Sequence, residues 1–77
     1  MTISYKLKGT HCKFGAIGTP SEFVYEAFAN TPLEAMNSIR ETLYQEGYER
    51  ILFKEAFVMS VEHKWEEIPM MEALGLE

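Results

Sequence analysis

Apolar and polar residues alternate along residues 3–8 of the chain. The apolar set is Ile3, Tyr5 and Leu7, and the polar set is Ser4, Lys6 and Lys8. A period of two predicts a β-strand with one buried face and one face toward solvent. Gly9 and Thr10 interrupt this pattern, and residues 12–17 are expected to form a second short strand, where the glycines of this region suggest a bulge or bend.

A further extended segment follows a predicted turn at residues 18–21. Gly18 tolerates positive φ and Pro20 fixes φ, a combination that is typical of turns. Residues 23–28 are rich in aromatic and β-branched side chains. They predict a strong strand, which ends at Asn30.

Residues 31–47 carry the start and stop signals of an α-helix. Thr31 can cap the first free amides, Pro32 fits the first helical position, and Glu34 can bond back to the amide of the cap. Gly47 suits the left-handed conformation that commonly ends a helix. The apolar residues fall within an arc of about 180° at roughly 100° per residue. The helix is therefore expected to cover one face of a sheet.

The longest extended segment, residues 51–65, exceeds the usual strand length of about 3–10 residues. Its apolar residues lie mostly on one parity, which Glu55 and His63 interrupt. Two interpretations fit: one strand bent by a bulge at Lys54-Glu55, or two strands that meet there. We favour the single bent strand because no Gly, Pro or Asn offers a tight turn.

The tail predicts a helix of one to two turns, with Pro69 at its start and Gly75 at its end. Residues 1–77 are therefore expected to form a single α+β domain. Its small antiparallel or mixed β-sheet, in the order β-β-(β)-α-β, is covered on one face by the main helix, with the short C-terminal helix added. The expected core is Tyr5, Leu7, Phe23, Tyr25, Leu33, Met36, Ile39, Leu43, Phe53, Phe57, Met59 and Val61.

Length, charge and cysteine content narrow the class of protein. A chain of 77 residues supports one domain with a small core. The lone Cys12 fits a reducing compartment, and no apolar run approaches the roughly 20 residues of a membrane span, so we expect a cytoplasmic protein without membrane contact. The net charge of −5 argues against general nucleic-acid binding, although the first 20 residues are basic.

No group of residues predicts catalysis. His11 and Cys12 place a base beside a nucleophile, but consecutive residues of a strand point to opposite faces. We expect a half-buried thiol and, at His11 and His63, two surface histidines. One Cys and two His are too few for a structural zinc site, and the glycines match no nucleotide-binding loop. We therefore expect no enzyme activity, no metal and no cofactor.

Two groups of residues are candidates for partner binding. The C-terminal group combines Trp and Met, which are favoured at recognition surfaces, with acidic residues. It consists of Trp65, Glu66, Glu67, Met70 and Met71. The second group is acidic and lies on or just after the main helix: Glu34, Glu41, Glu46 and Glu49. The short C-terminal helix fits two roles equally, an interface or a cover for the sheet.

These features favour a non-enzymatic protein-binding module that engages a larger protein through an acidic and apolar surface. Small size, acidity and the lack of a catalytic set are typical of regulatory proteins and of inhibitors encoded by phages or mobile elements. The acidic face would suit the basic groove of a nucleic-acid-binding protein. The alternative is a small nucleic-acid-binding or translation-associated domain, and a homodimer is compatible with either. That alternative would use Lys6, Lys8, Lys13, Phe14 and Arg50.

Overall fold

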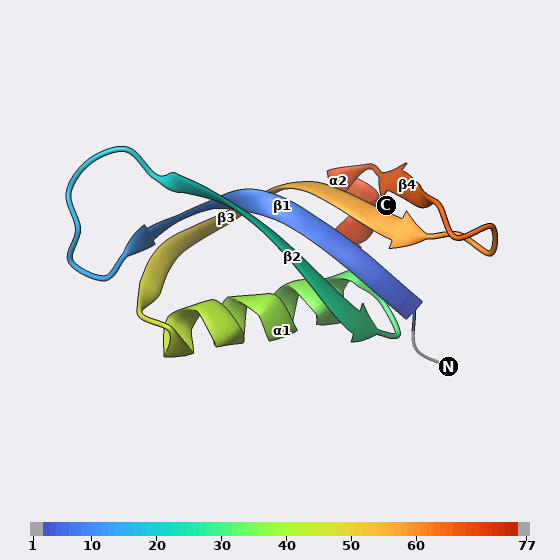
Figure 1. The fold of residues 1–77 in the computed structure, drawn as a ribbon, viewed down its shortest axis with the longest axis horizontal. Coiled ribbons are helices and arrows are strands. Elements are labelled where there is room, and N and C mark those ends of the chain that lie inside the picture. The colour runs from blue at the N-terminus through green and yellow to red at the C-terminus, as the bar shows by residue number, and fades with distance from the viewer. Residues whose placement is uncertain (1–2, 76–77) are drawn as a thin grey trace.

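A computed structural model describes residues 3–75 as a four-stranded antiparallel sheet with one main helix against one of its faces (Figure 1). In chain order the elements are β1 (Ile3–Lys13), β2 (Ser21–Ala29), α1 (Pro32–Gln45), β3 (Tyr48–Met59), β4 (Trp65–Ile68) and α2 (Met70–Ala73). The strands lie in the order β2-β1-β3-β4, each antiparallel to its neighbours. The predicted α+β fold, with its short C-terminal helix, is confirmed.

The helix α1 begins and ends where the local signals predict. Thr31 is the N-cap, and its side-chain oxygen accepts a hydrogen bond from the Glu34 N–H at 3.2 Å. The Glu34 carboxylate accepts from the N–H of Asn30 at 3.0 Å, and not from the amide of the cap itself as expected. Gly47 has a φ of 94° and directs the chain into β3.

The predicted break at Gly9 is wrong, because β1 continues without interruption to Lys13. Gly9 is buried beside β3, where a Cβ atom would overlap the carbonyl oxygen of Leu52. The glycine is therefore needed for close strand approach and does not end the strand. The residues from Phe14 to Pro20, which include part of the predicted second strand, form the connection to β2.

A bulge at Lys54 bends β3, as one of the two interpretations required. Lys8 pairs with Glu55 and the next residue, Gly9, pairs with Phe53, so Lys54 is the extra residue. The favoured single strand through residue 65 is nevertheless wrong, because a turn at residues 60–64 separates β3 from β4. His63 makes this turn possible with a φ of 62°, a conformation that histidine adopts more readily than most non-glycine residues.

The core lies between the sheet and α1. The deepest large side chains are Leu7, Met36 and Leu43, and the predicted core members Tyr5, Phe23, Ile39 and Phe53 are also buried. The small residues Ala29, Ala35, Ala56 and Ala73, which the prediction omitted, complete the cluster. They allow strands and helices to approach closely.

Five predicted core residues are not fully buried. Tyr25 is half-buried but packs against the core, Leu33 is 41% exposed on α1, and Val61 is 97% exposed in the turn between β3 and β4. Phe57 and Met59 are half-buried on the other face of the sheet. The bulge explains this reversal, because the extra residue moves Ala56 onto the α1 side and turns Phe57 away from it.

Within residues 3–75 there is no helix with the length and apolar character needed to cross a membrane.

Candidate functional site

The sheet face turned away from α1 is covered by no helix of the described chain (Figure 1). Because Tyr5 and Leu7 are buried toward α1, the strand residues between and beside them point to the opposite side. We name this surface the open face. From the strand register it consists of Ser4, Lys6, Lys8 and Thr10 on β1; Glu22, Val24, Glu26 and Phe28 on β2; Leu52, Glu55, Phe57 and Met59 on β3; and Trp65 and Glu67 on β4.

A cluster of two lysines and two aromatic rings occupies the middle of the open face. The Lys6 ammonium nitrogen lies 5.0 Å from the ring centroid of Phe57 and 4.9 Å from that of Trp65. The Lys8 ammonium nitrogen lies 5.2 Å from the Phe57 centroid. These distances are within the range of about 6 Å for cation–π attraction. The two rings therefore lie beside the lysines of β1 on the two strands that follow it in the sheet.

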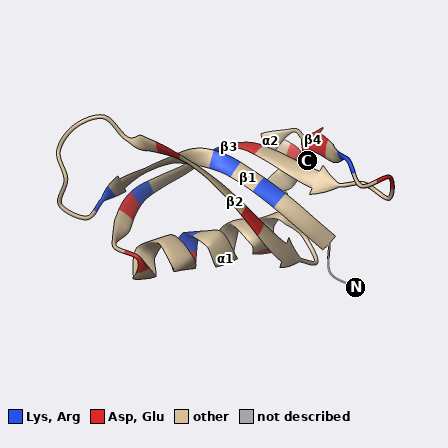
Figure 2. Cartoon of the chain, in the orientation of Figure 1, with Lys and Arg blue, Asp and Glu red and all other residues tan. Residues whose placement is uncertain are grey.

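The charges of the open face follow the strands. Basic positions run along β1, and acidic positions lie on the adjoining strand β2 (Figure 2). Lys6 is opposite Glu26 on β2, and Lys8 is opposite Glu55 on β3. A shallow hollow of about 280 Å³ beside Lys8 is lined in part by Lys54 and Val24. The open face thus offers both signs of charge at fixed positions.

Large apolar side chains on the open face contact solvent. Val24 and Leu52 are each 57% exposed, and Phe28 is 76% exposed. Exposed aromatic and aliphatic side chains interleaved with charges of both signs are chemically suited to contact a protein surface that is itself partly apolar and partly charged.

The predicted acidic group contributes mainly to the protein's own structure. Glu34 accepts a hydrogen bond at the start of α1, and a Glu49 carboxylate oxygen accepts one from the Gly15 N–H at 3.3 Å. The Tyr25 hydroxyl donates to Glu46 at 3.2 Å, and burial together with this hydrogen bond raises the pKa of Tyr25 above its usual value. Among the four acids, Glu41 makes no side-chain hydrogen bond or ion pair in the part of the chain that is described.

The predicted C-terminal group is divided between two sides of the sheet. Trp65 and Glu67 are on the open face, whereas Glu66 pairs with Val58 on the α1 side. On α2, Met70 packs against the core and Met71 is 56% exposed. The structure therefore does not bring the predicted acidic and apolar residues together on one surface. It joins Trp65 to Lys6, a contact that the sequence did not predict.

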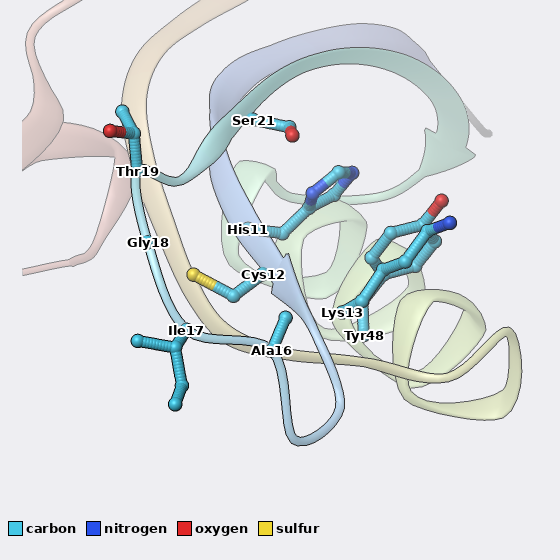
Figure 3. Close-up of a pocket in the computed structure, with 9 residues that line it drawn as sticks. All are labelled: His11, Cys12, Lys13, Ala16, Ile17, Gly18, Thr19, Ser21 and Tyr48. Atoms are coloured by element: carbon cyan, nitrogen blue, oxygen red, sulfur yellow. The ribbon is translucent and has the colours of Figure 1, made fainter.

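A second hollow, of about 230 Å³, lies under the connection between β1 and β2 (Figure 3). His11, expected at the surface, is instead buried, and its ring stacks on Tyr48 with centroids 4.0 Å apart and on Phe23 at 5.1 Å. Cys12 is also buried, and not half-buried as expected. The His11 ring and the Cys12 thiol point in different directions in Figure 3, so the two do not form a nucleophile–base pair.

The His11 Nδ1 atom has no hydrogen-bond partner in the described structure. No group of three or more His, Cys, Asp or Glu side chains within residues 3–75 is arranged to bind a metal ion. The β1–β2 connection around the hollow is exposed to solvent from Lys13 to Pro20.

Sequence reasoning missed the lysine–aromatic cluster of the open face because it placed Phe57 in the core. The available signal was the position of Lys54 and Glu55 within an otherwise apolar segment, which marked the bulge but did not give its register. Comparison of the chain with protein-family models, with curated proteins and with solved structures found no match.

Proposed function

We propose that this protein is a non-enzymatic binding module that docks a larger protein against its open face. The Lys6–Phe57–Trp65 cluster supports this proposal most directly, because two aromatic rings and an ammonium group contact one another on an uncovered sheet face. Ordered aromatic side chains are frequent anchors of interfaces, since little side-chain entropy is lost when the partner binds.

The charge pattern indicates what kind of partner surface would fit the open face. A complementary surface would present acidic groups to Lys6 and Lys8 and basic groups to the glutamates on the strands beside them, with apolar side chains over Phe28 and Trp65. The net charge of −5 would speed the encounter with a basic protein, while the apolar contacts would slow its release. A regulatory protein or inhibitor that acts on a nucleic-acid-binding protein fits this description.

Affinity capture with quantitative mass spectrometry tests the proposal. The bait would be the full chain, compared with a Phe28→Ser/Leu52→Ser variant of the open face. Both residues are exposed, so the variant is expected to fold. If the open face is the docking surface, the variant should capture about one tenth or less of the partner that the wild type captures. The matched control is Leu33→Ser/Tyr44→Ser, which changes two exposed apolar residues of α1 and should capture as much as the wild type.

A Trp65→Ala bait and a bait with charge reversals at Glu34, Glu41 and Glu46 complete the comparison. Loss of the partner from the first, with retention by the second, supports docking on the open face. The proposal is wrong if the charge-reversed and α1 variants lose the partner while the open-face variants keep it. It is also wrong if the wild-type bait captures no partner at low salt.

The same cluster also favours a second candidate function, binding of single-stranded nucleic acid. Lysines beside aromatic rings form stacking platforms for bases in several domain types. Glu22, Glu26 and Glu55 on the same face would repel phosphate groups, which makes this the weaker candidate. Fluorescence anisotropy with a labelled single strand of about 12 nucleotides tests it. Binding that falls steeply from about 50 to about 200 mM salt would favour this function over the first.

A further inference from the structure

The two outer edges of the sheet differ in how well they are protected against pairing with a strand of another chain. The edge strand β4 has four residues, and Pro69 follows it directly. Short edge strands and prolines both hinder pairing with another chain. The other edge strand, β2, has nine residues and contains no Lys, Arg or Pro. No strand within residues 3–75 pairs with its outer side, which therefore presents a free row of backbone N–H and C=O groups (Figure 1).

Two copies of β2 would pair antiparallel about a two-fold axis perpendicular to the sheet. This symmetry keeps both α1 helices on one side of the joined sheet and both open faces on the other. Because α1 packs on β2 and β3 alike, it lies across the inner strand β1 and does not extend along the β2 edge alone.

The position of the glutamates on β2 selects one register. A pairing centred on Val24 would place Glu22 opposite Glu26 of the second copy, and a pairing centred on Glu26 would place that residue opposite itself. Like charges directly opposite each other destabilise a strand pair. A pairing centred on Tyr25 avoids both contacts and joins all nine residues. It places Glu26 opposite Val24 and Glu22 opposite Phe28.

We infer that β2 is a dimerisation edge, at which a second copy of this chain adds its own β2 in the register centred on Tyr25. The product is a continuous antiparallel sheet with four strands from each copy. Val24 and Phe28, now 57% and 76% exposed, gain cross-strand neighbours. The dimer doubles the area of the open face, and it would form whether or not that face binds a partner.

Substitutions at Val24 separate the dimer contact from the contact within the chain. Within the chain Val24 is opposite Lys8, whereas across the dimer it would be opposite Glu26. Val24→Glu therefore gains an attractive neighbour within the chain and a repulsive one across the edge, and Val24→Lys does the reverse. We expect Val24→Glu to raise the dimer dissociation constant by about tenfold or more, since symmetry introduces the repulsion twice. Val24→Lys should leave the constant unchanged or lower it.

Sedimentation equilibrium measures these constants. The wild type should show a species of twice the 8.9 kDa mass of one chain. Leu52→Glu is the matched control, because Leu52 is equally exposed but lies on the inner strand β3, so this variant should dimerise normally. If Leu52→Glu dimerises but captures less partner, the dimer and the proposed binding function are distinguished.

Cross-linking tests the register. In a Cys12→Ala background, a short bifunctional thiol reagent should link a Val24→Cys chain to a Glu26→Cys chain in a mixture, and should link Val24→Cys alone poorly. Efficient linking of Val24→Cys to itself, or equal dissociation of the Val24→Glu and Val24→Lys variants, would overturn the register. A wild-type protein that remains monomeric up to its solubility limit would overturn the dimer.

Discussion

At Gly9 the backbone of β1 passes so close to β3 that a side chain would overlap the carbonyl oxygen of Leu52. The same position lies beside the bulge at Lys54, where the register of β1 and β3 shifts by one residue. Because Gly9 has no Cβ atom, β1 and β3 can approach closely at the bend that places Phe53 in the core and Phe57 on the open face.

Replacing Gly9 with alanine should destabilise the protein by about 3 kcal/mol, because backbone atoms must move to admit the methyl group. Urea denaturation followed by circular dichroism measures this loss. Gly15→Ala is the control: Gly15 has a φ of 80° but no neighbouring atom within 4 Å of the added Cβ. It should cost only about 1 kcal/mol, the strain of the left-handed conformation. Equal losses for the two variants would contradict the close approach at Gly9.

At the scale of elements, α1 is the segment whose sequence signals correspond best to the structure. Thr31, Pro32 and Gly47 act through their own neighbours in the chain, so local chemistry is sufficient to fix both ends. The turn between β3 and β4 shows the opposite case. His63 adopts positive φ there, but the turn contains no Gly, Asn or Asp, the residues whose presence would predict that conformation most clearly.

Replacing the cap residue in Thr31→Ala should lower the free energy of unfolding by about 1 kcal/mol, because the Glu34 N–H loses its acceptor. Thermal and urea unfolding both report the change. Thr31→Asp supplies another acceptor at the same position and should unfold like the wild type. The assignment of this cap is contradicted if the alanine and aspartate variants are equally stable.

At the scale of the whole molecule, one side of the sheet is buried and the other is not. The helices contribute to a single core on the α1 side, and the uncovered side carries Lys6, Phe57 and Trp65. The molecule measures 41 × 23 × 20 Å, and a domain of this size buries only a small hydrophobic core. Association at the β2 edge would therefore add appreciably to the free energy of unfolding.

The melting temperature should therefore rise with protein concentration. A dimer that unfolds to two chains, with an unfolding enthalpy of about 0.7 kcal/mol per residue, should gain about 5 °C for each tenfold increase in concentration. Differential scanning calorimetry over two decades of concentration measures this dependence. Val24→Glu, whose dimer should dissociate about tenfold more readily, should show the same rise only at about tenfold higher concentrations. A wild-type melting temperature that stays constant over the same range, at concentrations where sedimentation shows the dimer, would contradict coupled folding and association.

Features that depend on near neighbours in the chain could be predicted from the residues alone. The caps of α1, the alternation of β1 and the α+β class follow from hydrogen-bonding side chains and from periods of two and 3.6 residues, both of which act locally. Three features emerge only from the folded arrangement: the register at Lys54, the burial of His11 and the contact between Lys6 and Trp65. These depend on which strands lie side by side, and a shift of one residue exchanges the two faces of a strand. For that reason the core side of the sheet was largely predictable, and the surface proposed to bind a partner was not.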